Sequence, residues 1–104
     1  MLMEEISEQQ GQEQTEKSGY TTINIRNVPV MQSSIEVLSI LGNKNKVILK
    51  ASGNSIPNAV AVANIITEKM LKGNSKVEKI TLDTESAAGI GRMVSTIEII
   101  LNKN

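Results

Sequence analysis

The sequence predicts a two-layer α/β (α+β) sandwich, in which two helices cover one face of a four-stranded mixed sheet. Three observations predict this class. First, apolar residues alternate with a period of two near both ends of the domain. Second, in two segments between these ends, apolar residues recur every three or four positions. Third, glycine or proline separates the segments from one another. The expected order of elements is β-α-β-α-β-β, with two crossovers and a final hairpin.

The first strand and the first helix meet at a proline. Residues 22–26 alternate polar and apolar side chains, as a half-buried strand requires, and Pro29 then suits the first turn of a helix. Along one face of that helix, apolar residues recur at spacings of four, three and three: Met31, Ile35, Leu38 and Leu41. We expect the helix to end at about Gly42, because glycine adopts the positive φ of a C-terminal cap without strain.

A short apolar strand and a second helix follow. The run Val47-Ile48-Leu49, which lies between two lysines, predicts a strand buried on both faces. Ser55 suits the N-cap of the next helix and Pro57 suits its first turn. That helix is expected to end near residues 72–74, and its inward stripe comprises Ile56, Val60, Ala63, Ile66 and Met70.

The last third of the chain predicts a long hairpin. One strand carries Val77, Ile80 and Leu82, and the other alternates Ile97, Ile99 and Leu101. Residues 86–92 between them contain Gly89, Gly91 and small side chains. A linker of this length and composition predicts a flexible arm that projects into solvent, because a tight hairpin turn needs only two residues.

The composition bounds the size and chemistry of the protein. A chain of 104 residues forms one domain with a modest core. Tyr20 is its one aromatic residue, so the core is expected to be aliphatic. Pairing with a second copy of the chain would add buried apolar area. The absence of cysteine and histidine removes thiolate chemistry, the commonest metal ligand and the usual general base. We therefore expect no enzyme activity, no cofactor and no metal.

We expect neither a membrane span nor a secretory signal in this sequence. No apolar run approaches the roughly 20 residues of a membrane span, and the N-terminus is rich in glutamate and glutamine, unlike a secretory signal. A soluble, cytoplasmic protein is expected.

The net charge of zero conceals an uneven distribution. Residues 1–19 hold five glutamates against one lysine, whereas residues 20–104 hold ten lysines and arginines against six acidic residues. Because the first segment has few large apolar residues, it is expected to be a disordered acidic tail on a mildly basic domain. The simpler interpretation of the tail is a solubilising extension, and the alternative is that it competes with nucleic acid for the basic surface of the domain.

The charged residues of the domain favour binding over catalysis. Carboxylates lie on different expected elements, with no spacing that predicts a catalytic pair: Glu36, Glu68, Asp83, Glu85 and Glu98. Arg26 lies at the end of the first expected strand, Lys50 at the end of the second, and Arg92 in the arm. If those two strands are parallel, these three cations lie at one edge of the sheet, although scattered surface cations are the equally weighted alternative.

Three segments resemble the Alba family of small archaeal chromatin and RNA-binding proteins, in the family's order and over essentially residues 20–104. They are Asn27-Val28-Pro29-Val30-Met31, Lys50-Ala51-Ser52-Gly53-Asn54-Ser55-Ile56 with the following Ala59-Val60, and the stretch from Val94 to Ile99. The resemblance implies the fold of the C-terminal domain of translation initiation factor three and a homodimer. It also implies two hairpin arms that reach along the minor groove of DNA, beside a central saddle made by the loops before the two helices.

The chain departs from the family's pattern at that saddle. Where the family has a pair of lysines, this chain has Asn27 and Val28, and where many members have arginine or lysine it has Ser52, Asn54 and Asn58. Affinity for duplex DNA depends largely on counterion release from phosphates, so these replacements are expected to weaken binding to DNA. The remaining amides and hydroxyls suit contacts with sugars and bases, which favours RNA.

The candidate nucleic-acid-binding residues are therefore Arg26, Asn27, Lys50, Ser52, Asn54, Asn58 and Arg92. Arg92 is the first choice, because an arm otherwise made of small residues needs a charge to anchor it. Roles in turns remain an alternative for Asn27 and Asn54, and roles in the first turn of the second helix remain one for Ser55 and Asn58.

The function expected from the resemblance is sequence-nonspecific binding of double-stranded DNA, RNA or both, by a homodimer associated with the chromosome in the cytoplasm. The alternative is a dimeric interaction protein that has lost most of its affinity for nucleic acid. Such a protein would work through a paralogue, in a heterodimer, or through another protein partner.

Overall fold

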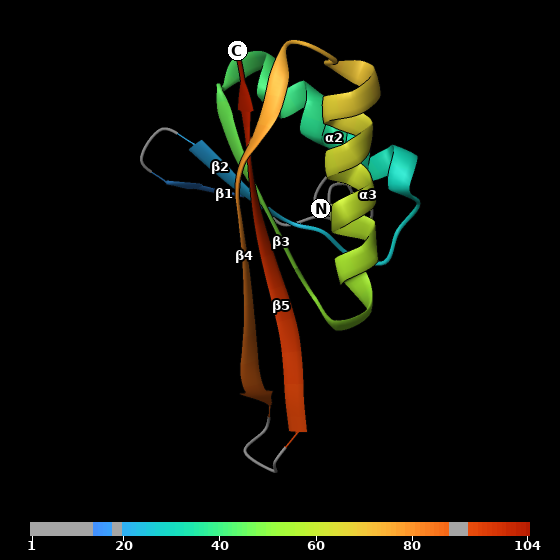
Figure 1. Ribbon diagram of the computed structural model, residues 1–104, viewed down its shortest axis with the longest axis vertical. Coiled ribbons are helices and arrows are strands. Elements are labelled where there is room, and N and C mark those ends of the chain that lie inside the picture. Colours follow the sequence, from blue (N-terminus) through green and yellow to red (C-terminus); the bar gives the residue numbers. More distant parts are fainter. Residues whose placement is uncertain (1–13, 18–19, 88–91) are drawn as a thin grey trace, which may run out of the picture.

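The computed structural model describes residues 14–17, 20–87 and 92–104 and shows two layers, helices packed on one face of a sheet (Figure 1). The sheet has the strand order β1-β2-β3-β5-β4. Its strands are β1 (Gln14–Lys17), β2 (Tyr20–Asn24), β3 (Lys46–Ser52), β4 (Ser75–Ala87) and β5 (Arg92–Lys103). The helical layer comprises α2 (Val30–Asn43), η1 (Gly53–Ser55), α3 (Ile56–Ile65) and η2 (Ile66–Met70).

The predicted fold class is confirmed. The four expected strands are β2 to β5, the two expected helices are α2 and α3, and the sheet is mixed because β2 and β3 are parallel while every other pair is antiparallel. The parallel pairing brings the C-terminal ends of β2 and β3 to the same edge of the sheet. Arg26 and Lys50 therefore lie at the same edge, the arrangement expected from the sequence if these two strands were parallel.

The tail prediction is wrong for Gln14–Lys17. These residues form β1 and pair antiparallel with β2, with Gln14 opposite Ile23 and Lys17 opposite Tyr20. Composition argues against burial of side chains, but pairing at a sheet edge needs only backbone N–H and C=O groups, which β2 offers on its outer side. Residues 1–13 and 18–19 lie outside the described part of the chain.

The core fills the space between the sheet and the helices. Ile23, Leu49 and Ile99 are 0 to 1% exposed and come from β2, β3 and β5, the three inner strands. The expectation for Val47-Ile48-Leu49 is confirmed, because all three side chains are buried although successive residues point to opposite faces. The remaining core residues include Val37, Leu41, Val47, Ala59, Val62, Ala63, Ile66, Ile97 and Leu101.

The inward face of each helix agrees with the prediction only in part. Leu41, Ala63 and Ile66 are buried as expected, and Leu38, Ile56 and Met70 pack against the core. In α2 the buried residues are Ser33, Ser34, Val37 and Leu41, whereas Met31 is 54% exposed and Ile35 58% exposed. Two adjacent stripes on a helix share the same spacing, so periodicity alone does not choose between them. The two serines have small side chains that suit a buried face. In α3, likewise, Ala59 and Val62 are buried and Val60 is 40% exposed.

The predicted caps are also corrected. Gly42 lies inside α2, which ends at Lys44 in an extended conformation, and positive φ occurs among the described glycines at Gly53 and Gly73 instead. Ser55 precedes α3 as expected, but its side chain makes no capping hydrogen bond. The reason is that Ser55 already has helical angles, since it closes the 3-10 turn η1.

The strands β4 and β5 form the predicted long hairpin, which runs well past the helices (Figure 1). Their pairing extends from Ser75 opposite Lys103 to Ala87 opposite Arg92, with a bulge between Val77 and Lys79. The turn of the hairpin, with Gly89 and Gly91, lies outside the described residues, so the flexible arm stays a prediction. Within the described residues, no helix combines the length and apolar character that a membrane crossing needs.

Ser34 provides a test of how α2 packs. Its hydroxyl oxygen is buried and has no hydrogen-bond partner, and a buried polar group left unsatisfied costs about 1–3 kcal/mol. We expect Ser34→Ala to raise the free energy of unfolding by about 1 kcal/mol, measured by urea denaturation. The control is Ser39→Ala, in the same helix but exposed, where a change of only a few tenths of a kcal/mol is expected, roughly the difference in helix propensity. A loss of stability in Ser34→Ala would contradict this account.

Candidate nucleic-acid interface

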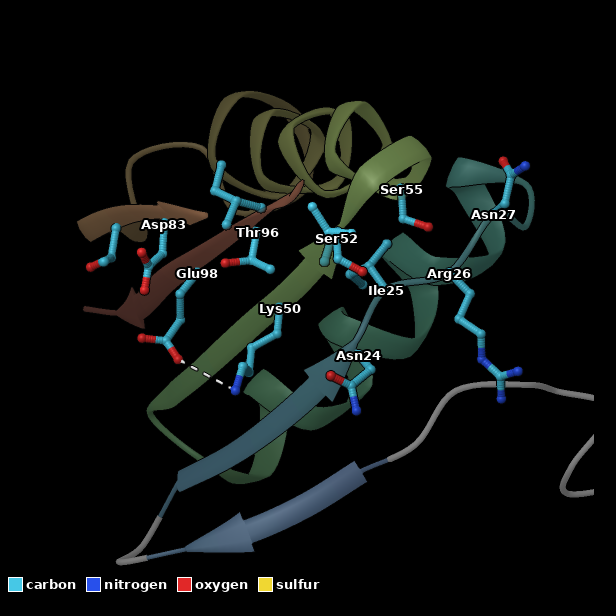
Figure 2. A pocket seen from close by; sticks show the side chains of 14 residues that line it. Asn24, Ile25, Arg26, Asn27, Lys50, Ser52, Ser55, Asp83, Thr96 and Glu98 are labelled. Carbon is cyan, nitrogen blue, oxygen red and sulfur yellow. Dashed lines mark ion pairs between the residues drawn. The ribbon is translucent and has the colours of Figure 1, made fainter. Parts of the chain in front are cut away.

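A cleft of about 820 Å³ lies on the helix-free face of the sheet, where β2 and β3 end (Figure 2). Its walls come from the end of β2 and the loop after it, the second half of β3, η1, and the middle of β4 and β5. The residues that line it are Asn24, Ile25, Arg26, Asn27, Lys50, Ala51, Ser52, Ser55, Thr81, Asp83, Val94, Thr96, Ile97 and Glu98.

Strand register places most of the polar lining on this face. Asn24 is opposite Lys50, Lys50 is opposite Glu98, and Glu98 is opposite Thr81, so one polar row crosses four strands. A shorter row beside it contains Ser52, Thr96 and Asp83. Since neighbours along a strand alternate between faces, the buried residues between these positions face the helices and the polar ones face the cleft.

The loop after β2 is held in place by two sets of hydrogen bonds. The backbone N–H of Ile25 donates to the carbonyl oxygen of Lys50 at 2.7 Å, which continues the parallel ladder by one residue. The side-chain Nδ2 of Asn58, in the first turns of α3, donates to the carbonyl oxygens of Arg26 and Val28, both at 3.2 Å. These bonds position Arg26 and Asn27, which are exposed, at the rim of the cleft.

Opposite charges balance inside the cleft. Lys50 Nζ lies 4.0 Å from Glu98 Oε2, and Asp83 lines the same cleft, where its Oδ1 accepts a hydrogen bond from the N–H of Thr84 at 2.7 Å. Two cations, Arg26 and Lys50, therefore face two carboxylates. A phosphate that enters the cleft would meet attraction from the two cations and repulsion from the two carboxylates.

Another ion pair lies toward the opposite end of the sheet. Glu78 Oε1 is 3.3 Å from Lys46 Nζ and accepts a hydrogen bond of 2.6 Å from Asn102 Nδ2. The Asn102 hydrogen bond, together with the hydrogen bond and charge of Lys46, lowers the pKa of Glu78 below its usual value. Because the carboxylate is stabilised in the folded state, its contribution is present above the ordinary pKa of glutamate and is lost as the pH falls through the lowered value.

The structure brings four of the seven candidate residues together: Arg26, Asn27, Lys50 and Ser52 all line the cleft. Asn54 is exposed in η1 beside the cleft but is not part of its lining, and the amide of Asn58 serves the loop after β2. From the sequence, Asn58 was expected to contact nucleic acid or to serve the first turn of α3. Its hydrogen-bond partners instead lie 30 and 32 residues away in the chain, so the sequence did not predict this role. The side chain of Arg92 lies outside the described residues, so its role stays a prediction.

Sequence reasoning missed the acidic side of the cleft. Asp83 and Glu98 are on neighbouring strands, with Asp83 opposite Thr96 and Glu98 opposite Thr81, so the two carboxylates are diagonal neighbours. The two come from different elements, as expected, but the sequence did not predict that both line one cleft. The sequence predicted the hairpin but not its register. The register determines which residues of β4 and β5 are opposite one another, and it depends on the bulge near Val77 and on the length of the arm.

The side chains that line the cleft suit the binding of a ligand through hydrogen bonds and charge. Hydroxyls of Ser52 and Thr96 and the amide of Asn27 offer hydrogen bonds, and Arg26 offers a charge-assisted donor. Among the residues that the structure describes, no group of three or more carboxylates is placed to hold a metal ion.

Comparison with known proteins gives one family. The Alba family profile matches residues 21–84. A relative from Thermoplasma volcanium, named DNA/RNA-binding protein Alba, is 40% identical over 78 residues, which cover 72% of this chain and 86% of the relative. A protein of the same name from Nitrosopumilus maritimus is 38% identical over 86 residues, 80% of this chain and 90% of the relative. The solved structure of Alba from Thermoplasma volcanium superimposes with a TM-score of 0.69 at 38% identity, and covers 79% of this chain and 99% of its own.

The Asn58 amide gives a stability test that separates a structural role from a surface role. We expect Asn58→Ala to lower the free energy of unfolding by about 1 kcal/mol, because the part-buried Val28 carbonyl and the Arg26 carbonyl lose their donor. Thermal or urea unfolding measures this difference. Asn54→Ala is the matched control, an exposed asparagine four residues away, for which a change within about 0.5 kcal/mol is expected. Equal effects of the two substitutions would contradict the role given to Asn58.

Proposed function

Since the chain belongs to the Alba family, we propose that it is a non-enzymatic protein that binds nucleic acid, DNA, RNA or both, without sequence specificity. The relatives that it matches carry the name DNA/RNA-binding protein Alba, and they come from archaea. The proposal places this protein at the chromosome, in the cytoplasm of an archaeal cell.

The observation that carries this proposal is the convergence at one rim of Arg26 and Asn27, from the loop after β2, with Ser52, the last residue of β3. The rim lies beside the helix-free sheet face, and Arg26 and Asn27 are exposed there. Guanidinium, amide and hydroxyl groups are the groups with which proteins contact phosphates and sugars. Such contacts position a nucleic acid without reading its sequence.

The charge balance of the cleft supports weak binding to duplex DNA. Lys50 lies near Glu98, and Asp83 adds a second carboxylate, so the two cations that line the cleft, Arg26 and Lys50, are matched by two acidic side chains. Each phosphate contact contributes about one unit to the dependence of log affinity on log salt concentration. We therefore expect the log affinity for duplex DNA to fall only slowly with log salt concentration. The affinity itself should be lower than a fully cationic saddle would provide.

Uncharged donors along the same rim favour RNA. Asn27, Ser52 and Thr96 form hydrogen bonds with ribose hydroxyls and with base edges that are exposed in loops and single strands. These contacts lose less affinity in salt than phosphate contacts do, because they release no counterions. RNA is therefore the favoured target in this proposal.

Exposed apolar residues support a homodimer. Ile80 and Leu82 are opposite Ile99 and Ile97 and therefore share the helix-side face of the sheet, yet they are 54% and 72% exposed. Val77 and Met93 on the same hairpin and Val60 on α3 are also exposed large apolar residues. Isolated apolar residues are common on surfaces, but a set gathered on one hairpin suits burial against a second copy.

A second function remains, an interaction protein that works through a partner. The charge-balanced cleft and the apolar hairpin favour it, because such a protein would keep the dimer surface while its affinity for nucleic acid was low. The partner would be a more basic paralogue that occupies the place of the second copy, or another protein.

Arg26 tests nucleic-acid binding. We expect Arg26→Ala to weaken binding to a labelled structured RNA by about five- to twenty-fold and to reduce the salt slope by about one, because one phosphate contact is removed. Titrations of RNA and of duplex DNA at two salt concentrations measure both quantities.

The control for this titration is Lys72→Ala, which removes one exposed positive charge beyond η2, at the end of the helical layer remote from η1. Equal losses in the two variants would mean that net charge, not the rim, determines affinity. No binding of either nucleic acid by the native protein, even at low salt, would sink the nucleic-acid proposal and favour the interaction protein.

Leu82 tests the homodimer. We expect Leu82→Glu to convert a dimer to a monomer in sedimentation equilibrium, since a charge would be buried at the subunit interface without a partner. Ile35→Glu is the matched control, because Ile35 on α2 is also more than half exposed but lies away from the hairpin. A native monomer, or a dimer disrupted by the Ile35 variant alone, would overturn the assignment of the surface.

A further inference from the structure

The helix-free face of the sheet continues past the cleft toward the opposite end of the strands. There Lys46 of β3 is opposite Asn102 of β5, and Asn102 is opposite Lys76 of β4. The next row toward the cleft ends in Lys79 of β4. Because Lys46 lies four residues before Lys50 in β3, and opposite residues on neighbouring strands point to one face, these lysines share the face that carries the cleft.

This end of the face carries a surplus of positive charge. The carboxylate beside the lysines is that of Glu78, at the bulge of β4, and its Oε1 lies 3.3 Å from Lys46 Nζ. A hydrogen bond from Asn102, a hydrogen bond and the charge of Lys46, and the charge of Lys76 all lower the pKa of Glu78. Three lysines therefore meet one carboxylate here, whereas the cations that line the cleft are matched by carboxylates.

Lys76 and Lys79 are the exposed part of this charge. Ion pairs between described residues on this face join Lys46 to Glu78 and Lys50 to Glu98, and neither pair includes Lys76 or Lys79. Their strand, β4, is an outer strand of the sheet, and the structure describes no strand on its outer side (Figure 1). A ligand therefore has access to both lysines from the helix-free face.

From this arrangement we infer that Lys76 and Lys79 form a second phosphate-binding surface, separate from the rim, for the backbone of a nucleic acid that lies on the helix-free face. Lys46 is a positioning residue, because its ion pair engages the Glu78 carboxylate that would otherwise attract the neighbouring lysines. The inference rests on the proposed function, since it takes nucleic acid as the ligand. It adds a surface that none of the candidate residues marks.

The spacing of the rows suits a phosphate backbone. Successive rows on one face of a strand are about 7 Å apart, and Lys76, Lys79 and Thr81 occupy three successive rows. One strand of a duplex rises about 3.4 Å per phosphate, so every second phosphate of a strand that runs along β4 comes level with a row. Thr81 lines the cleft, so a nucleic acid on this path contacts both the lysines and the polar groups of the cleft.

Exposed lysines also have two simpler roles. Many surface cations are only solvated, and lysines on an edge strand discourage edge-to-edge association of sheets. The first role predicts that removal of Lys76 and Lys79 changes nothing. The second predicts self-association with no loss of affinity for nucleic acid, so measurements of affinity and of oligomeric state separate both roles from a binding surface.

The test compares two pairs of substitutions that remove the same charge. Lys76→Gln with Lys79→Gln neutralises the proposed surface, and Lys69→Gln with Lys72→Gln neutralises two exposed lysines in η2 and just beyond it. We expect the first pair to bind a labelled structured RNA about five- to thirty-fold more weakly than the native protein, with a salt slope smaller by about two. The second pair should bind within about two-fold of the native protein, because remote exposed charges are screened.

A conservative pair separates charge from packing. Lys76→Arg with Lys79→Arg keeps both positive charges and should bind the same RNA within about three-fold of the native protein. Equal weakening in the two glutamine pairs would overturn the surface, and so would unchanged affinity in the first pair. A loss in the arginine pair as large as in Lys76→Gln with Lys79→Gln would do the same. Self-association of that glutamine pair in sedimentation equilibrium, with unchanged affinity, would assign the lysines to edge protection instead.

A second readout does not depend on nucleic acid. When the native protein is titrated with inorganic triphosphate, the N–H signals of Lys76, Lys79 and Asn102 should shift in two-dimensional amide spectra, and those of Lys69 and Lys72 should not. Such shifts in a protein that binds neither RNA nor DNA would overturn the proposed function and keep the phosphate-binding surface. Binding of RNA without these shifts, and without an effect of the first pair, would overturn the surface while the proposed function stands.

Discussion

The parallel pairing of β2 with β3 is the constraint on which the rest of the site depends. It sets Ile23 beside Leu49 in the core and Asn24 beside Lys50 on the helix-free face, and the bond from the Ile25 N–H to the Lys50 carbonyl oxygen extends it. Because the two strands run in the same direction, the loops that follow them leave from one edge. An antiparallel pair would have placed the Arg26 loop and the Ser52 loop at opposite ends of the sheet.

The central position of β5 couples stability to recognition. One face of β5 supplies Ile97, Ile99 and Leu101 to the core, and the other supplies Thr96 and Glu98 to the cleft. A strand between β3 and β4 contacts both neighbours, so a change in its register would move core and cleft residues together. The charge balance of the cleft is thus tied to the register that buries the core.

The helical layer shows where sequence patterns reach their limit. Periodicity located α2 and α3, because it is a local property of the chain. Pro57 lies in the first turn of α3 as expected, whereas Pro29 is the N-cap that precedes α2. The same periodicity selected Met31 and Ile35 as inward residues, and the structure buries Ser33 and Ser34 instead. The rotation of a helix about its axis depends on the side chains of the sheet against which it packs. Buried serines are not apolar, so a hydrophobic pattern does not reveal which face of the helix is inward.

By itself the sequence determined the order of the elements from β2 to β5, the aliphatic core and the buried strand around Ile48, since these follow from composition and local alternation. It placed Arg26 and Lys50 at one edge only on the condition that β2 and β3 are parallel. Only the tertiary structure decided that Asp83 and Glu98 join them, that Asn58 holds the loop, and that residues 14–17 pair with β2. Each of these depends on contacts between residues far apart in the chain or on strand register, which no local pattern encodes.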